Sequence, residues 1–108
     1  MDEGRLPTHL EVSGLIRRVQ AAGGFATVLR KGERDAGSLA IVLSHSGTTA
    51  SLWERLPQLD GRRKFVASRT QDPDNPHEFG DYIDRRTRQD SDLWILELDV
   101  ADAERFIA

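Results

Sequence analysis

The chain has 108 residues, of which 38% are hydrophobic and 31% charged, and its formal net charge is −3. This length and composition predict one soluble globular domain over residues 1–108 and exclude a disordered chain. Because cysteine is absent, disulfide bridges, thiolate zinc sites and cysteine nucleophiles are excluded together, and we expect a cytoplasmic protein. No apolar run approaches the roughly 18 residues of a membrane helix, so we expect no membrane partner.

The first predicted element is a helix that begins at Thr8 and ends at the pair Gly23-Gly24. Thr8 and Glu11 have the spacing of a capping box, in which each side chain satisfies a backbone N–H at the helix start. Gly14 lies inside this helix and weakens it by about 1 kcal/mol relative to alanine, which a close backbone contact would explain. Apolar residues recur at spacings of three and four and form one stripe: Val12, Leu15, Ile16, Val19 and Ala22.

Four strand-like segments follow this helix, and the first two are rich in β-branched and apolar residues. They cover residues 25–30, 39–43, 48–56 and 62–69. The loops between them are short and polar, and contain the glycine, proline and aspartate residues typical of turns. Successive strands with such connections predict an antiparallel meander.

The rest of the chain predicts a second helix, a fifth strand and a short final helix. Asn75 is suited to the N-cap of the second helix, and Glu78 three residues later completes a capping box. Residues 92–98 predict the fifth strand, and Asp99 or Asp102 would cap the final helix. The order α-β-β-β-β-α-β-α predicts an α+β domain, in which helices pack on a mainly antiparallel five-stranded sheet.

Four stretches of the sequence, taken in order, resemble a known family. They are LPTHLEVSGLIRRVQAAGGFATVLRKGERDAG, LWERLPQLDG, TQDPDNPHEF and DLWILELDVADAERFI. The chain resembles a family of small, mostly alphaproteobacterial proteins known only as a domain of unknown function. The resemblance implies a bacterial, cytoplasmic protein, and it carries over no catalytic residues.

The acidic stretch at the start of the second helix raises the question of a metal site. His77 and Asp81 are one helical turn apart, but Asp81 stands where the His-Glu-x-x-His pattern of zinc proteases needs its second histidine. Acidic residues are also favoured in a first helical turn, because the free N–H groups there carry partial positive charge. Capping therefore explains this stretch, and we expect no metal or other cofactor. A metal-dependent enzyme around His77 and Asp81 is the weakest alternative.

Nucleophilic catalysis finds little support in the sequence. His45 and Ser46 are neighbours, but adjacent residues on a strand point to opposite faces and cannot easily share a proton. No Gly-x-Ser-x-Gly elbow is present. We therefore assign no catalytic residue and favour a protein without enzymatic activity.

The third predicted strand carries a tryptophan among polar residues. Alternation places Leu52 and Leu56 on one face, which we expect to be buried, and Trp53 with Arg55 on the other face. The next strand adds further cations near Trp53. Such a face is typical of an aromatic anchor for another protein, or of a platform that stacks single-stranded nucleic acid, and the alternative is that Trp53 packs under a helix. The candidate partner-binding face consists of Trp53, Arg55, Arg63, Lys64 and Arg69.

Charge is distributed unevenly along the chain. Residues 1–71 carry eleven Lys and Arg against seven Asp and Glu, whereas residues 72–108 carry four against eleven. Segregation of this kind can orient docking between proteins. We therefore expect a protein partner or a homo-oligomer such as a homodimer. The alternative is a weak binder of single-stranded nucleic acid that uses the Trp53 face, although a net acidic chain counts against it.

Overall fold

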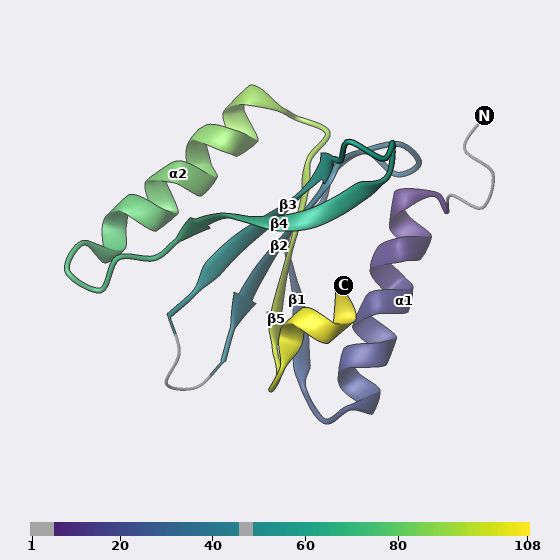
Figure 1. Ribbon diagram of the computed structural model, residues 1–108, viewed down its shortest axis with the longest axis horizontal. Helices are drawn as coiled ribbons and strands as arrows, with labels where there is room; N and C mark the ends of the chain where they lie inside the picture. Colours follow the sequence, from purple (N-terminus) through teal and green to yellow (C-terminus); the bar gives the residue numbers. More distant parts are fainter. Residues whose placement is uncertain (1–5, 46–48) are drawn as a thin grey trace.

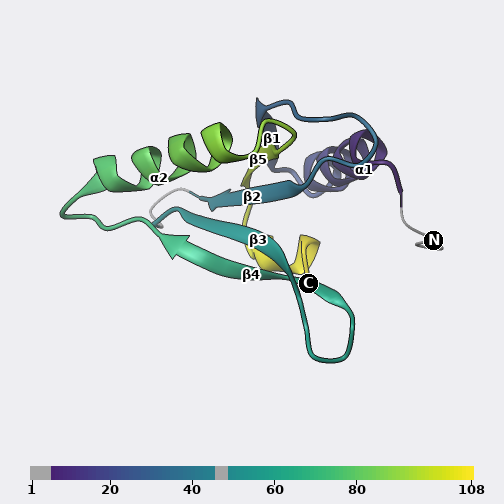
Figure 2. The ribbon, with the colours of Figure 1, turned by 90° about the horizontal axis from the view of Figure 1, so that it is seen from above.

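A computed structural model describes residues 6–45 and 49–108 of the protein. Figure 1 shows the two longer helices on either side of the strands, and Figure 2 shows the β3–β4 hairpin projecting away from them. The predicted α+β class and element order are confirmed, with a single 3-10 turn as the last helix. The elements are α1 (Thr8–Ala21), β1 (Phe25–Arg30), β2 (Leu39–Ser44), β3 (Ser51–Pro57), β4 (Arg63–Thr70), α2 (Pro76–Gln89), β5 (Trp94–Asp99) and η1 (Ala103–Phe106).

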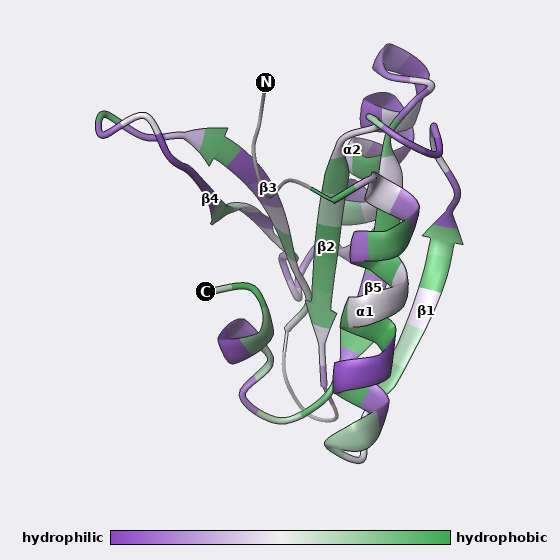
Figure 3. Cartoon of the chain, turned by 90° about the vertical axis from the view of Figure 1, so that its right-hand side faces the viewer, coloured by the Kyte–Doolittle hydropathy of each residue, from purple (hydrophilic) through white to green (hydrophobic). Residues whose placement is uncertain are grey.

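The five strands form one mixed sheet in the order β1-β5-β2-β3-β4. Neighbouring strands are antiparallel except β2 and β5, which run parallel. The predicted meander is therefore correct for β2, β3 and β4 but wrong for β1, because β5 lies between β1 and β2 (Figure 3). This position suits β5, since the strand is buried at most positions instead of alternating between apolar and polar residues.

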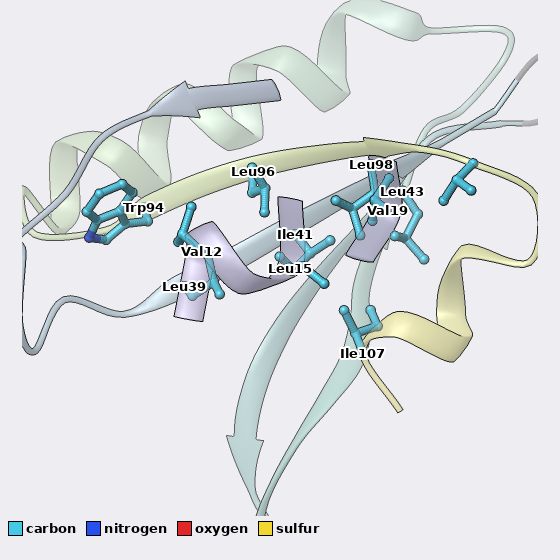
Figure 4. Close-up of a cluster of buried hydrophobic side chains, with 11 residues drawn as sticks. Val12, Leu15, Val19, Leu39, Ile41, Leu43, Trp94, Leu96, Leu98 and Ile107 are labelled. Carbon is cyan, nitrogen blue, oxygen red and sulfur yellow. The ribbon is translucent and has the colours of Figure 1, made fainter. Parts of the chain in front are cut away.

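Each face of the sheet carries its own hydrophobic cluster. On the α1 face, the helix packs Val12, Leu15 and Val19 of its predicted apolar stripe onto the odd-numbered residues of β2 and the even-numbered residues of β5 (Figure 4), whereas Ala22 is exposed. On the α2 face, Phe79 is the buried residue of the helix and covers the alternate residues of the same strands. The buried cluster beneath α1 comprises Val12, Leu15, Val19, Leu39, Ile41, Leu43, Trp94, Leu96, Leu98, Val100 and Ile107. The cluster beneath α2 comprises Ala40, Val42, Leu52, Phe79, Leu93 and Ile95.

The start of α1 is held by the loop between β1 and β2. The backbone N–H of Thr8 donates to the carbonyl oxygen of Asp35 at 3.1 Å, and the Thr8 hydroxyl donates to the carbonyl oxygen of Gly37 at 2.7 Å. No side chain caps the helix. The predicted capping box of Thr8 and Glu11 is therefore wrong, because the loop supplies acceptors that a capping side chain would otherwise provide.

The other two helix starts also lie where the sequence predicts them but lack the predicted caps. Asn75 is the N-cap residue of α2 without a side-chain bond to the backbone, and its amide nitrogen lies 3.4 Å from the Glu78 carboxylate. Asp102 precedes η1 in a left-handed conformation, with φ of 52°, and its side chain makes no capping bond either. Among the described residues, no helix is long and apolar enough to cross a membrane.

The β1–β2 loop crosses over the beginning of β5. The Glu33 N–H donates to the Asp92 carbonyl oxygen at 3.0 Å, and the Trp94 indole N–H donates to the Glu33 carbonyl oxygen at 2.6 Å. Gly32 and Gly37 permit this approach, because an added Cβ at these positions would lie 2.1 and 2.3 Å from the Asp92 carbonyl oxygen. The loop therefore joins β5 to α1 through backbone contacts.

Replacing Gly32 by alanine should lower the free energy of unfolding by about 1–3 kcal/mol, because the new methyl group must displace the backbone at the start of β5. Gly14→Ala is the matched control. Nothing lies within 4 Å of a Cβ at Gly14, so the contact expected there is absent and alanine should stabilise α1 by up to about 1 kcal/mol. Urea denaturation measures both effects, and a Gly32→Ala protein as stable as the wild type would contradict the close crossing.

Candidate functional site

Trp53 lies on the α1 face of β3 and is only partly exposed. Its ring packs against the cluster beneath α1, and its indole N–H donates to the Ser51 hydroxyl oxygen at 2.8 Å. Leu52 points the other way and is buried beneath α2, as alternation predicts. Leu56, which was expected to be buried with Leu52, is 46% exposed, because the end of β3 extends into the projecting hairpin (Figure 2).

Arg55 shares the α1 face with Trp53, but its guanidinium is engaged within the chain. It donates two hydrogen bonds to the Glu11 carboxylate, at 2.6 and 2.9 Å, and lies 4.9 Å from the centre of the Phe65 ring. Arg63 donates to the Arg55 carbonyl oxygen at 3.2 Å. Glu11, freed from a capping role, thus ties α1 to the β3–β4 ribbon.

The other two candidate residues lie on the opposite face of the sheet. The register of β3 and β4 places Lys64 opposite Leu56 and Arg69 opposite Leu52, both on the α2 face. Arg69 lies there because a β-bulge next to Leu52 shifts the pairing by one residue, which simple alternation along β4 does not anticipate. The structure groups the candidate residues into two sets: Trp53, Arg55 and Arg63 on the α1 face, and Lys64 and Arg69 on the α2 face.

Two arginines join α2 to the sheet. Arg69 of β4 contacts the helix, and Arg86 of the helix contacts β3. Arg69 donates to the Glu78 carboxylate at 3.3 Å and lies 4.1 Å from the centre of the Tyr82 ring. Arg86 donates to Glu54 Oε1 from two nitrogens, at 3.0 and 2.7 Å. Burial raises the pKa of Glu54, but its hydrogen-bonding neighbours, Arg86 among them, lower it by more, so the pKa lies below its usual value.

His77 and Asp81 are both exposed on α2. Within the described residues, no group of three or more His, Asp and Glu side chains is placed to hold a metal ion. Ser46, the other residue weighed for chemistry, lies outside the described residues. His45 Nδ1 is hydrogen-bonded to Asp99 Oδ1 at 3.0 Å, which links the ends of β2 and β5.

A pocket of about 530 Å³ lies at the carboxyl ends of the parallel strands β2 and β5, beneath η1. A volume of this size can admit a small molecule. Its polar lining mixes hydroxyl groups, an imidazole and charges of both signs, so the chemistry selects no particular class of ligand. The polar lining residues are Ser44, His45, Thr49, Ser51, Asp102, Glu104 and Arg105.

Strand β1 forms a free edge of the sheet and exposes large apolar side chains. Phe25 is 71% exposed, Leu29 50% and Val28 41%. Within the described chain β1 pairs only with β5, so its outer backbone edge has no strand partner. Figure 3 shows this apolar strand at the outer border of the molecule. Sequence reasoning missed this edge, because a strand that is apolar and uncharged from Phe25 to Leu29 resembles a core strand until the strand order is known.

The second free edge, β4, is of a different kind. It carries Arg63, Lys64 and Arg69 along its length. Charged residues on an edge strand oppose pairing with another sheet. Between Phe25 and Leu29, β1 contains no charge and no proline. The β4 edge therefore opposes pairing with another strand more strongly than the β1 edge does.

The fold defines a small α+β protein with a mixed five-stranded sheet. Comparison with known proteins identifies its family. A family model described as a protein of unknown function (DUF1491) matches residues 6–108. A crystal structure of a DUF1491 family protein from Caulobacter crescentus is 31% identical, with a TM-score of 0.80 and 96% of each chain covered. The chain belongs to the DUF1491 family, and the resemblance found in the sequence is confirmed.

A second similar structure comes from another alphaproteobacterium. The solution structure of a protein from A. tumefaciens is 30% identical, with a TM-score of 0.77, and the alignment covers 95% of this chain and 92% of that chain. None of the curated proteins compared with the chain matches it significantly. Family membership therefore establishes the fold and the bacterial relatives, and the function must be argued from the surface.

The Glu54–Arg86 pair leads to an expected pH dependence. Because the folded-state pKa of Glu54 lies below its usual value of 4.5, the pair stabilises the fold above that pH and loses its contribution as the pH falls through the folded-state pKa. Glu54→Gln should lower the free energy of unfolding at pH 7 by about 1.5 to 3 kcal/mol. The free energy of unfolding of this variant should also fall less steeply than that of the wild type as the pH is lowered.

Urea denaturation at pH 7 and at acidic pH measures this effect. Glu104→Gln removes an exposed carboxylate from η1 and is the control, since it should leave the stability at pH 7 unchanged. A Glu54→Gln protein with the stability and acid sensitivity of the wild type would show that the pair does not hold α2 on the sheet.

Proposed function

We propose that this protein is a non-enzymatic protein-docking module and that its docking element is the free edge of β1. One observation carries this proposal: a single strand combines exposed apolar side chains with an unpaired backbone edge. A strand from a partner protein would cover both at once. In such strand addition, backbone hydrogen bonds supply affinity, and side chains that alternate between the two faces supply specificity.

The exposed side chains of β1 are large enough to matter energetically. Full burial of a phenylalanine, valine or leucine side chain stabilises by about 1.5–3 kcal/mol. Phe25 exposes most of its surface and lies on the α2 face opposite Asp99, whereas Val28 lies on the α1 face opposite Leu96. A partner strand would therefore gain apolar contacts on both faces of the sheet.

The Trp53 set is the less favoured docking surface. Trp53 is partly buried already, and Arg55 is paired with Glu11. Single-stranded nucleic acid is the weaker partner for the same reason, because the cations expected around Trp53 are divided between two faces and Arg69 is paired with Glu78. The open β1 edge needs no such pair to be broken.

Photo-cross-linking in cells tests the docking role. Photo-reactive benzoylphenylalanine in place of Phe25 should give protein adducts, because this position lies on the docking edge. The same residue in place of Ala67, exposed on the β4 edge, should give none. Adding Leu29→Lys should remove the adducts at position 25, since a charge on an edge strand opposes pairing. Adducts only from Ala67, or adducts that persist with Leu29→Lys, would contradict the proposal.

A further inference from the structure

We infer that the partner of β1 is the β1 strand of a second copy of this chain, paired in the antiparallel direction. The inference rests on the docking role proposed for β1. A two-fold axis perpendicular to the sheet would join the two β1 edges and make one continuous sheet from both copies. In such a dimer the same patch is used on both sides, so the edge must be complementary to itself.

The charges at the two ends of the β1 edge have opposite signs. Arg30 and Lys31 stand at its carboxyl end, whereas on the neighbouring strand β5 Asp99 lies opposite Phe25 at the amino end and Glu97 lies opposite Thr27 near the centre. Antiparallel pairing brings the basic end of each copy against the acidic end of the other, so the favourable contact occurs twice. Parallel pairing would set like charges against each other, which is unfavourable. For two copies, the charge pattern therefore favours the antiparallel over the parallel direction.

A β-bulge in β1 aligns these charges on one face. Thr27 lies opposite Glu97, and Arg30 lies opposite Ile95, with the register shifting between Val28 and Arg30. Without this bulge, alternation would turn Arg30 to the α1 face. Because of it, Arg30 and Glu97 both lie on the α2 face, where a partner's side chains can meet them.

The Nε atom of Arg30 is buried and has no acceptor among the described residues. The ion pairs formed between described residues include neither Arg30 nor Glu97. Arg69 has an unpaired Nε as well, but its guanidinium already contacts Glu78 and Tyr82. Because no ion pair between described residues uses the Arg30 guanidinium, a carboxylate from a second copy can bind its outer nitrogens.

Charge reversal tests whether the partner is a second copy and whether the two β1 strands run antiparallel. One variant carries Arg30→Glu, and the other carries Glu97→Lys. Light scattering over a concentration series should show a dimer for the wild type and about tenfold weaker dimerisation, or worse, for each variant alone. An equimolar mixture of the two variants should dimerise again, because both contacts in the mixed dimer then join opposite charges. Circular dichroism checks that both variants remain folded.

Cysteine trapping gives a second measurement that does not depend on these charges. The chain has no cysteine, so Thr27→Cys introduces a single thiol at the centre of the β1 edge. Under mild oxidation it should form a disulfide-linked dimer much faster than Thr70→Cys, which places the thiol at the end of β4. Equal rates for the two variants would overturn the inference.

The remaining outcomes separate this inference from the docking role itself. A wild-type protein that stays monomeric throughout the concentration series would overturn the second copy as partner. The docking role would still stand if position 25 then cross-linked to a different protein, and it would fail if position 25 cross-linked to nothing. A wild-type dimer whose variants dimerise normally, or whose mixed variants stay monomeric, would overturn the antiparallel charge pairing.

Discussion

The position of β5 between β1 and β2 is the constraint on which the rest of the structure depends. β5 runs parallel to β2 and antiparallel to β1, so the last strand of the chain completes a sheet that the first two strands leave open. The connection from β1 to β2 must then pass over the start of β5. Gly32 and Gly37 make that crossing sterically feasible at the Asp92 carbonyl.

The same crossing determines how the helices are attached. The β1–β2 loop offers its carbonyl oxygens to the start of α1, and the Glu33 carboxylate accepts the N–H groups of Ala36 and Asp35 inside the loop. These bonds, led by the one from Ala36, hold the pKa of Glu33 below its usual value. Because α1 needs no capping box, Glu11 is available to bind Arg55. One long-range crossing thereby links α1, β5 and the β3–β4 ribbon.

Local sequence patterns predicted the helices and strands well, but they did not predict which strands lie next to each other in the sheet. The apolar stripe of α1 and the segment 25–30 follow from side-chain periodicity, which acts within a few residues. The separation of β1 from β2 depends on a strand more than fifty residues away, which no local pattern encodes. The face of Arg69 depends on a bulge, and a bulge reverses the alternation beyond it. The open β1 edge became visible only once the strand order was known.

The contrast between the two edges argues that the exposed side chains of β1 serve pairing. Polar residues at Phe25 and Leu29 would remove little from the core, since both side chains are exposed, and would lessen the aggregation hazard of an open edge. The charges along β4 show that this chain can close an edge. In β1 the bulge limits the regular ladder to Phe25–Val28 and also turns Arg30 towards the face of Glu97. The bulge therefore shortens the regular part of the β1 edge and also determines on which face Arg30 lies. The position of this charge makes antiparallel pairing of the edge more favourable than parallel pairing.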